Sequence, residues 1–322
     1  MKRRSLLAAA PLATLSRFAK AQAWPERPLR FVVPYAPGGS TDTSARIVSE
    51  KLAQLLGQPM LVENKPGGGT IIGTEIVAKA KPDGLTILLT PAALIANAAF
   101  GVSVPYDIDK DLVPVAGFVD LSMLIAASNA APFKTMAELL AWPKAHSSAV
   151  ISYASAGIGS LTHLWGEYVK ARTHLPLEHV GYKGSAEALR DVIAGHVPLF
   201  FDVLVPTAAA IRAGQVRGLA VAMKTRSDLL PDVPTVAEAG LAGLEGSVPF
   251  GISVPAGTPD AIVMRLNAAF NETLTDPVTR RKLLELGFVP VGGTPQDYAR
   301  VLTKEIARWR KVIKDSNIPP PS

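Results

Sequence analysis

Short apolar runs alternate along this chain with longer stretches in which apolar residues recur every three or four positions. In residues 31–57, an apolar run breaks into a Pro-Gly-Gly loop, after which Ala45, Val48 and Leu52 follow at helical spacing until Gly57. The run predicts a β-strand, and the spacing predicts an amphipathic helix closed by a glycine. A strand end, a glycine loop and a helix N-terminus therefore follow one another in the sequence.

The same alternation continues through most of the chain. Strand candidates separated by helical patterns are typical of α/β domains with largely parallel sheets. The sequence therefore predicts an α/β fold. The predicted strands are residues 29–35, 60–63, 86–90, 150–154, 177–182, 199–203, 217–223 and 250–254.

Four glycine-containing loops each lie between a predicted strand and a predicted helix. Besides the loop around Gly38, they are residues 66–70, 155–160 and 182–185. In open α/β sheets such loops gather at the carboxyl ends of the strands, where ligands bind. Free N–H groups at a helix N-terminus favour a carboxylate or phosphate, and glycine allows a close approach. The sequence predicts an anion site where two such sheets face each other across a cleft.

Two interruptions of the pattern indicate the domain organisation. An apolar stretch at 119–127 and a glycine-containing stretch at 240–249 lie between the alternating units. Two crossings imply that one domain is inserted into another. We expect residues 24–124 and 248–322 to form lobe 1 and residues 125–247 to form lobe 2, with two strands between them as a hinge. An amphipathic helix near the C-terminus is expected to pack back onto lobe 1.

The first 23 residues have the features of an export signal. Lys2, Arg3 and Arg4 precede an apolar run at 6–15, and Ala-Gln-Ala at 21–23 resembles a cleavage site. The run is far shorter than the roughly 20 residues that span a bilayer. The paired arginines favour the twin-arginine route over the general one. We expect a periplasmic protein that begins near Trp24.

Charge and cysteine content exclude several classes of function. The signal holds five basic residues and no acidic one, so its removal lowers the formal net charge from +6 to +1. A nearly neutral chain without a basic cluster gives no reason to expect nucleic acid or an anionic membrane as partner. The absence of cysteine excludes disulfides, thiolate metal sites and thiol catalysis.

Signatures of catalysis and of cofactor binding are missing. The sequence contains no Gly-x-Ser-x-Gly, no Gly-Lys-Ser/Thr and no His-Glu-x-x-His motif. Thr162 stands where the third glycine of a dinucleotide loop would follow Gly157 and Gly159. His174 and His179 lack a third metal ligand and are expected to be structural. We therefore expect no cofactor, no metal and no catalytic residue.

A series of motifs in a fixed order resembles the Bordetella uptake gene (Bug) receptors, the solute-binding components of tripartite tricarboxylate transporters. The motifs are RPLRFVVPYAPGGSTDTSAR, LVENKPGGGTIIGTEIVAKAKPDGLTILLT, VPYDIDKDLVPV, YASAGIGSLTHLWGE, HVGYKGSAEALRDVIAGHV with FFD, RGLAVAM with PDVPTVAEAG, and VPAGTP. The resemblance implies a two-lobed, type II-like periplasmic-binding-protein fold with two mostly parallel sheets. It further implies that the lobes close on a small carboxylate held by loops of both.

Three departures from the family pattern concern the ligand more than the fold. Ala36 and Gly181 stand where the family usually has prolines, and Pro249-Phe250 replaces a segment that contains tryptophan. The first two lie on or beside the binding loops, so the identity of the carboxylate stays open.

In lobe 1, Gly38, Gly39, Ser40 and Thr41 are expected to present N–H and hydroxyl groups to one carboxylate, the alternative being a tight turn with an ordinary N-cap. Asp42 is expected to cap the helix. Further candidates at the strand ends of lobe 1 are Tyr35, Thr90, Pro91 and Ala92.

In lobe 2, Ser155, Gly157, Gly159 and Ser160 are expected to hold a second carboxylate or a hydroxyl, the alternative being simple turn chemistry. Two opposed helix ends suit a dicarboxylate. His163 either points into the cleft or lies outside direct contact with the ligand.

The fourth loop supplies Tyr182, Lys183 and Gly184 as ligand candidates, although Lys183 is alternatively a solvated charge at the rim. Asp202 ends an apolar strand and either binds an amino or hydroxyl group or caps a turn. If Asp202 points inward, its charge disfavours polyanionic ligands.

Together these features predict a monomeric extracytoplasmic receptor, not an enzyme, that captures a mono- or dicarboxylate and delivers it to the permease subunits of a tripartite transporter. One alternative is a periplasmic sensor that docks onto a two-component kinase. Another is a hydrolase that uses Ser160 and His163.

Overall fold

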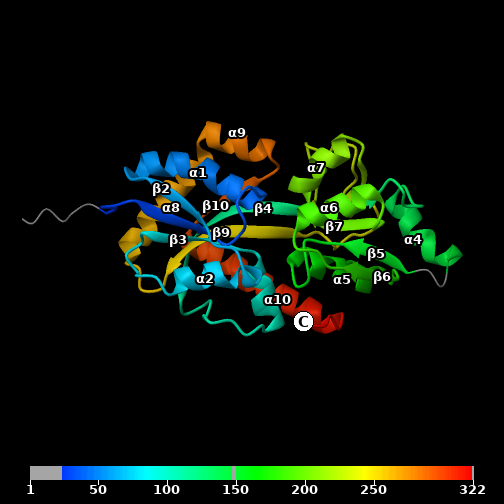
Figure 1. The fold of residues 1–322 in the computed structure, drawn as a ribbon, viewed down its shortest axis with the longest axis horizontal. Helices are drawn as coiled ribbons and strands as arrows, with labels where there is room; N and C mark the ends of the chain where they lie inside the picture. Colours follow the sequence, from blue (N-terminus) through cyan, green and yellow to red (C-terminus); the bar gives the residue numbers. More distant parts are fainter. Residues whose placement is uncertain (1–23, 147–149, 321–322) are drawn as a thin grey trace, which may run out of the picture.

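Two lobes joined by long strands make up the molecule (Figure 1). The computed structural model describes residues 24–146 and 150–320, with Ser40 described by its backbone only. The predicted export signal, residues 1–23, lies outside the described residues. Helices α1, α2, α8 and α9 surround the strands of one lobe, and α4 to α7 surround those of the other. The α/β fold with two lobes is confirmed.

Within the described residues the chain forms ten strands. All eight predicted strands are present, with ends that differ by no more than three residues, and two strands, β4 and β10, were not predicted. The strands are β1 Leu29–Val33, β2 Met60–Asn64, β3 Thr86–Thr90, β4 Leu112–Ser128, β5 Ile151–Ala154, β6 Leu177–Val180, β7 Leu199–Val203, β8 Val216–Val221, β9 Ser247–Pro255 and β10 Val289–Gly292.

The helices alternate with the strands over most of the chain, as the spacing of apolar residues predicts. They are α1 Ser40–Leu56, the short 3-10 helix η1 Gly68–Thr70, α2 Ile71–Ala78, α3 Ala93–Phe100, α4 Met136–Ala145, α5 Leu161–Thr173, α6 Ser185–Ala194, α7 Leu204–Arg212, α8 Asp260–Thr275, α9 Pro277–Glu285 and α10 Pro295–Asp315. None of the helices in the described part of the chain is long and apolar enough to cross a membrane.

One continuous sheet runs through both lobes in the order β2-β1-β3-β9-β4-β7-β5-β6, with β8 and β10 also paired to β4. Among the named strands of the described residues, the parallel pairs are β1 with β2 and β3, and β5 with β6 and β7. All pairs made by β4 and β9 are antiparallel. The sheets are thus less parallel than predicted, because the long strand that enters lobe 2 and the strand that returns to lobe 1 pair with each other.

Strand β4 extends the sheet from one lobe into the other. Its pairing with β9 ends at Ser122, and its pairing with β7 begins at Met123. The apolar stretch at 119–127 is therefore the C-terminal half of β4, in the region where the sequence predicted a crossing between lobes and a hinge strand without giving the bounds of that strand. The boundaries predicted at 124/125 and 247/248 stay predictions.

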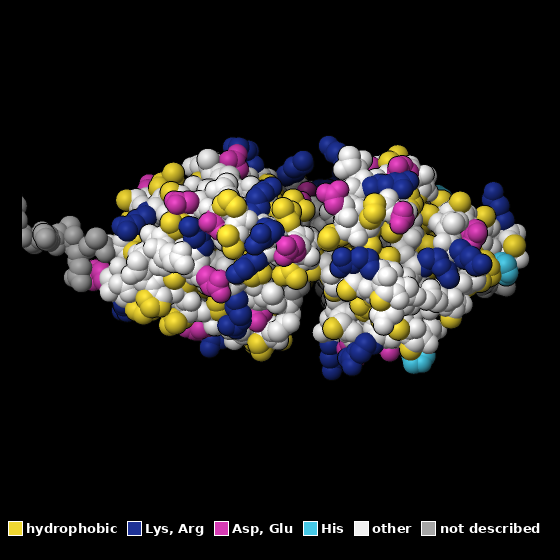
Figure 2. Space-filling view, turned by 90° about the horizontal axis from the view of Figure 1, so that it is seen from above, with side chains coloured by type: hydrophobic (Ala, Val, Ile, Leu, Met, Phe, Trp, Pro, Cys, Tyr) yellow, Lys and Arg dark blue, Asp and Glu magenta, His cyan; other side chains and the backbone are white. Residues whose placement is uncertain are grey.

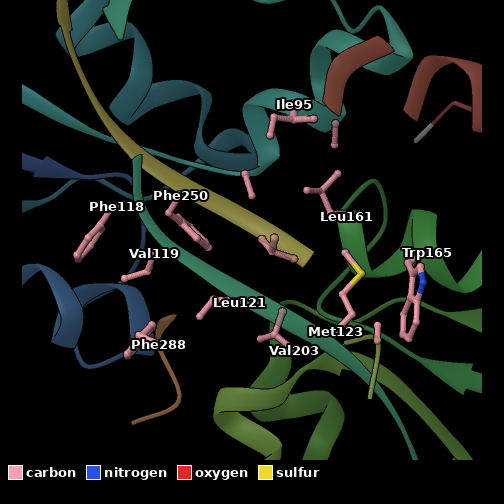
Figure 3. Packing of buried hydrophobic residues seen from close by; sticks show 14 of the residues in the cluster. Ile95, Phe118, Val119, Leu121, Met123, Leu161, Trp165, Val203, Phe250 and Phe288 are labelled. Carbon is pink, nitrogen blue, oxygen red and sulfur yellow. The ribbon is translucent and has the colours of Figure 1, made fainter. Parts of the chain in front are cut away.

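The largest hydrophobic cluster follows β4 and includes side chains of both lobes (Figure 3). Phe118 of β4 meets Phe270 of α8 edge to face, with ring centroids 5.4 Å apart. In the other lobe Trp165 of α5 packs on Phe201 of β7 at 5.7 Å. Dense packing on both sides of the junction fixes the sheet on which the binding loops sit.

Helix α10 closes lobe 1. Thr294 and Asp297 form a reciprocal capping box at its start. Trp309 is fully buried, and the helix contacts α3 and β4. The prediction that the C-terminal helix packs back onto the first lobe is confirmed.

Candidate functional site

The first glycine loop leads from β1 to α1 in lobe 1. Gly39 is the N-cap of α1, with φ −77° and ψ 171°, and none of the described side chains caps this helix. The expectation that Asp42 caps α1 is therefore wrong. Asp42 lies in the first turn, and its Oδ2 accepts the N–H of Gly38 at 2.9 Å. Gly38 has φ +82°, a conformation that glycine adopts without strain.

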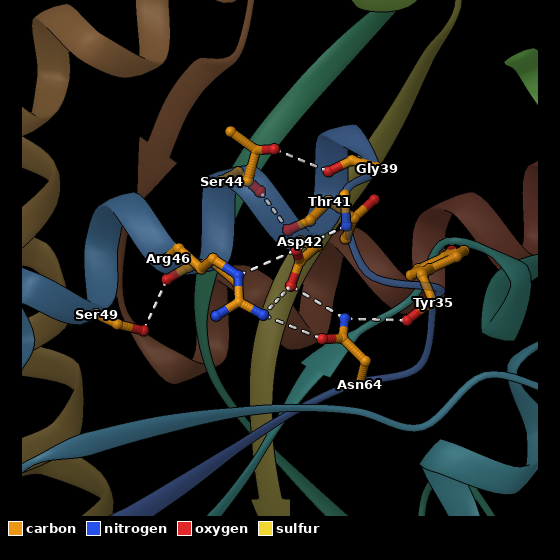
Figure 4. Close-up of polar contacts among 11 residues, drawn as sticks. Tyr35, Gly39, Thr41, Asp42, Ser44, Arg46, Ser49 and Asn64 are labelled. Carbon is orange, nitrogen blue, oxygen red and sulfur yellow. Dashed lines mark hydrogen bonds and ion pairs between the residues drawn. The ribbon is translucent and has the colours of Figure 1, made fainter.

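Asp42 is the centre of a network that holds this loop (Figure 4). It is only 3% exposed and accepts from Arg46 Nε at 3.0 Å and from Asn64 Nδ2 at 3.0 Å. The Asn64 amide also donates to the carbonyl of Tyr35 at 3.1 Å. Burial opposes ionisation of Asp42, but the hydrogen bonds from Arg46, Gly38 and Asn64 outweigh it and lower its pKa. The loop is thus held by a buried charge.

Among the described residues, no acceptor binds the backbone N–H of Thr41 or Asp42, the second and third residues of α1. The first N–H groups of a helix have no partner within the helix itself. The positive end of the helix dipole lies at the same place. Thr41 therefore keeps its predicted role as an anion donor, whereas the N–H of Gly38 is already used within the chain.

The end of β3 adds buried hydroxyl groups to lobe 1. Thr90 and Ser253 of β9 share a hydrogen bond of 2.7 Å, and both are 1% exposed. Tyr298 of α10 lies against Gly251, and its buried hydroxyl has no partner in the described part of the chain. Tyr35 packs on Phe250, with centroids 6.2 Å apart.

Sequence reasoning missed Ser253 and Tyr298 near this strand end. A polar residue within the apolar run of β9 was the available signal for Ser253. Pro91 and Ala92 are buried and lead into α3, with Ala92 as its N-cap. The hydroxyl of Thr90 is bonded to Ser253, and the roles of Thr90, Pro91 and Ala92 in ligand binding stay predictions.

The second glycine loop leads from β5 to α5 in lobe 2. Ser160 is the N-cap of α5, accepts from the N–H of His163 at 3.1 Å and donates to the carbonyl of Gly157 at 2.7 Å. Among the described residues, the N–H groups of Leu161 and Thr162 have no acceptor. Each lobe therefore presents a helix start with two free N–H groups.

The stacked side chains of His163 and His179 both form hydrogen bonds to the second loop. His163 is 8% exposed, and its Nδ1 accepts the N–H of Gly159 at 3.2 Å. His179 of β6 stacks on it at 4.0 Å and binds the hydroxyl of Ser155 at 2.8 Å through Nε2. Burial lowers the pKa of His163, and burial followed by the charge of His163 lowers that of His179 to about 3. Both rings are neutral supports of the loop.

This geometry does not make a catalytic pair of Ser160 and His163. The hydroxyl of Ser160 donates to a carbonyl, and the Nδ1 of His163 accepts from the backbone of Gly159. A hydrolase needs a base within hydrogen-bond reach of its nucleophile. Within the described residues, no group of three or more metal-ligating side chains comes together either.

The fourth loop begins α6. The hydroxyl of Tyr182 donates to Asp191 at 2.8 Å, and burial together with this bond raises the pKa of Tyr182 to about 12. The N–H of Lys183 donates to Glu187 at 3.2 Å, while its side chain is exposed. Gly184 is the N-cap of α6, with φ +140°. Tyr182 and Lys183 are thus tied to α6 through groups that were expected to hold a ligand.

Asp202 lies at the carboxyl end of β7 and is 1% exposed. Its Oδ1 accepts the N–H of Val203 at 2.7 Å, but its Oδ2 has no hydrogen-bond partner in the described part of the chain. Burial raises the pKa of Asp202 to about 7, partly offset by Ser185 and Val203. A carboxyl group in this state carries a proton near neutral pH for part of the time.

The two sets of loops lie on different lobes, and a groove separates the lobes at the surface (Figure 2). The lobes come into contact where α3 approaches α5, near Ile95 and Leu161 (Figure 3). Helix α3 begins directly after the Thr90 strand end, and α5 begins directly after Ser160. The fold therefore brings loops from both lobes toward one junction.

Known proteins are similar to this chain in sequence over most of its length. The family model described as "Tripartite tricarboxylate transporter family receptor" matches residues 44–318. The UPF0065 protein in the tcbD-tcbE intergenic region of Pseudomonas sp. (strain P51) is 38% identical over 97% of this chain and 94% of its own length. BugT of Bordetella pertussis is 34% identical over 92% of this chain and 91% of its own.

Two solved structures are similar over nearly their whole length. R. palustris Rpa4515 with adipate is 35% identical, with a TM-score of 0.85, and the match covers 92% of this chain and 99% of that one. MatC of Rhodopseudomonas palustris with bound malate is 33% identical, with a TM-score of 0.80, over 90% of this chain and 100% of that one. The resemblance to Bug receptors is confirmed.

Proposed function

Because this chain belongs to the family of tripartite tricarboxylate transporter receptors, we propose that it captures a small organic carboxylate in the periplasm and delivers it to membrane permease subunits. Members of this family bind solutes, so the chain is a receptor and not an enzyme. Export by the twin-arginine route and a monomeric state are part of the proposal.

One observation carries the proposal of a carboxylate ligand. Each lobe offers a glycine loop and a helix start with two backbone N–H groups in the first turn that have no acceptor among the described residues, at Thr41 and Asp42 in lobe 1 and at Leu161 and Thr162 in lobe 2. Such groups bind carboxylate oxygens through hydrogen bonds to a charged acceptor. Closure of the lobes would bring both helix starts onto one ligand.

We favour a dicarboxylate as the ligand. Two opposed donor sets match two carboxylate groups, and two similar receptors were solved with malate and with adipate, both of which are dicarboxylates. Of the proposed site residues only Lys183 is a cation, and its side chain is exposed. Neutral donors suit one carboxylate at each end better than the clustered charge of a tricarboxylate.

A ligand panel tests the proposal. Mature protein from Trp24 onward, refolded to remove bound ligand, is melted with mono-, di-, tri- and aromatic carboxylates and with amino acids. A ligand at a hundredfold excess over its dissociation constant stabilises the folded state by about 2.7 kcal/mol. We expect the shift to be confined to dicarboxylates. A folded protein whose melting no carboxylate changes would refute the proposal.

A charge placed at each helix start locates the site. Ser160→Asp keeps an N-cap residue of similar quality but adds a negative charge, and Ser160→Asn is its neutral, isosteric control. We expect the Asp variant to weaken dicarboxylate binding by about 100-fold or more through like-charge repulsion, and the Asn variant to stay within about tenfold of the original chain. Thr41→Asp and Thr41→Asn repeat the comparison in lobe 1. Equal binding by Asp and Asn variants would place the ligand elsewhere.

A further inference from the structure

The loop before α5 exposes one large apolar side chain, that of Ile158. This side chain is 57% exposed, whereas the other exposed large hydrophobic side chains of the described residues lie outside the four glycine loops. Gly157 and Gly159 flank it, with φ of +142° and +76°. The N–H groups proposed as donors to a carboxylate, those of Leu161 and Thr162, follow three and four positions later. A ligand held by these donors therefore has an exposed isoleucine in the same loop.

Two glycines determine where the side chain of Ile158 lies. Strands β5 and β6 are parallel partners up to their carboxyl ends, so the loops that follow them lie side by side. A Cβ atom on Gly181 would lie 2.6 Å from Cγ1 of Ile158. A Cβ atom on Gly157 would lie 2.7 Å from the carbonyl oxygen of Tyr182. Ile158 thus packs on the backbone of Gly181 at the carboxyl ends of β5 and β6, the end of lobe 2 at which α5 begins.

Four hydroxyl groups near Ile158 already have partners within the chain. The Oγ1 of Thr162 accepts the N–H of Ala156 at 3.3 Å and shares a hydrogen bond of 3.0 Å with Ser160. The carboxyl group of Asp202, at the end of the adjacent strand β7, is only 1% exposed. A ligand hydroxyl beside Ile158 would therefore lose its water without gaining a partner from these side chains. The other three hydroxyl groups bond to a histidine ring, a carbonyl and a carboxylate, and belong to Ser155, Ser160 and Tyr182 respectively.

The start of α5 thus combines hydrogen-bond donors with hydrocarbon. Its donors are the N–H groups of Leu161 and Thr162. The imidazole of His163 adds to them, because its Nδ1 accepts the N–H of Gly159 and the proton of the neutral ring is then on Nε2. Hydrogen bonds to a charged acceptor are the stronger ones, so these donors favour a carboxylate over a hydroxyl. The apolar surface of Ile158 favours C–H groups of a ligand.

On the basis of the proposed carboxylate site, we infer that Ile158 is a specificity-determining residue. It selects dicarboxylates in which the carbon next to the bound carboxylate carries neither a hydroxyl nor an amino group. One carboxylate of such a ligand accepts from the N–H groups of Leu161 and Thr162, and the methylene group beside it covers Ile158. A 2-hydroxy or 2-amino acid would place a polar group against this apolar side chain and bind more weakly.

Calorimetric titration of the mature chain with succinate and with tartrate tests this inference. Tartrate has the carbon chain of succinate with a hydroxyl on each of its two inner carbons, so turning the ligand around cannot keep a hydroxyl away from Ile158. We expect tartrate to bind at least about tenfold more weakly, which reflects the burial of an unpaired hydroxyl. Adipate and 2,5-dihydroxyadipate repeat the comparison with a longer chain, and the pair that binds more tightly decides.

Matched variants assign the selectivity to Ile158. Ile158→Thr and Ile158→Val have the same shape and differ by one hydroxyl, which in the Thr variant can pair with the hydroxyl of tartrate. We expect the ratio of the tartrate Kd to the succinate Kd to be about fivefold lower in the Thr variant than in the Val variant. Gly181→Ala displaces Ile158 and should lower the ratio of the original chain as well. Val150→Thr, at a 60% exposed position before the amino end of β5, should leave the ratio unchanged.

Two results would overturn the inference: tartrate binding as tight as succinate binding, or the same ratio in Ile158→Thr and Ile158→Val. In either case the dicarboxylate still binds, so the proposed function stands and only the role of Ile158 is refuted. A folded chain that binds none of these dicarboxylates refutes the proposed function itself, and this inference with it. A thermal melt without ligand shows that each variant is folded, and if Gly181→Ala is not, the Thr and Val pair decides.

Discussion

The glycine loops before α1 and α5 both precede a helix start, but charged groups hold the first loop and neutral groups hold the second. In lobe 1 the loop is held by the buried carboxylate of Asp42, which pairs with Arg46 at 3.0 Å and accepts from Asn64. In lobe 2 the corresponding loop rests on hydroxyl and imidazole groups, Ser155 with His179, that carry no net charge. Both helix starts have free N–H groups, but charged side chains hold the loop before α1 and neutral side chains hold the loop before α5.

Two helix starts can therefore offer free N–H groups to an anion while different kinds of side chain hold the loops that precede them. Lobe 2 also contains Asp202, a buried carboxyl group whose pKa burial raises to about 7. In lobe 1 the pKa of Asp42 is lowered instead. Changes of pH should therefore act on lobe 2 across the neutral range and on lobe 1 only at low pH.

The largest expected effect comes from Asp202→Asn. Below about pH 4 the carboxyl is protonated in both the folded and the unfolded chain. As the pH rises from 4 to 7, only the unfolded chain releases the proton, so the original protein loses stability relative to the variant, by up to about 4 kcal/mol. Urea unfolding of both proteins at several pH values measures the difference. A difference that stays constant with pH would mean that the pKa of Asp202 is the same in the folded and the unfolded chain.

The second effect concerns the charged support of lobe 1. Asp42→Asn replaces an oxygen that accepts from Gly38 and Arg46 by an amide donor, so we expect a loss of about 3 kcal/mol in the free energy of unfolding at pH 7. The loss should shrink in acid, where the carboxylate of the original chain becomes protonated.

Asp297→Asn is the matched control for Asp42→Asn. Asp297 is also the third residue of its helix, accepts the N–H of a residue before it and pairs with a downstream arginine, but its side chain is 45% exposed. We expect Asp297→Asn to lower the free energy of unfolding far less than Asp42→Asn does. Equal losses at both positions would show that burial of Asp42 does not matter.

Much of the fold could be predicted because apolar runs in this chain end at glycine or polar residues. Strand β4 was missed for a physical reason: it is 17 residues long, contains Pro114 and Asp120, and lies partly in each lobe. Because β4 changes its pairing partners midway, its apolar and polar residues do not alternate with a single period. The short strand β10 was missed because Val289–Gly292 offers only two apolar side chains.

The sequence predicted which loops lie at helix starts, but it predicted less well which side-chain and backbone groups make contacts there. Glycine and N-cap residues mark the start of α5 correctly, since Ser160 caps it. At α1 the extended backbone of Gly39 takes the cap, so the polar residues after it are free for other contacts. The contact of Ser155 with His179 spans 24 positions and follows no period, so only the folded chain reveals it.

The smallest effect tests the neutral support of lobe 2 directly. His179→Gln retains a side chain that can bind Ser155 but cannot gain a proton. The folded pKa of His179, about 3, lies below the ordinary value of 6.5, so as the pH falls below 6.5 the unfolded chain binds the proton first and the original protein loses stability. Because the ring is partly exposed, we expect a loss of only about 1 kcal/mol relative to the variant between pH 7.5 and 5.

The change in stability with pH should have opposite signs at His179 and at Asp202 in lobe 2. Relative to its variant, the original protein should weaken toward acid at His179 and toward neutral pH at Asp202, because burial keeps both groups uncharged and they carry opposite charges when ionised. Urea unfolding at pH 7.5 serves as the internal reference, since His179 is neutral there in both states. If the His179→Gln difference instead favoured the original protein in acid, a buried positive charge would be supporting the loop, and the contrast with lobe 1 would disappear.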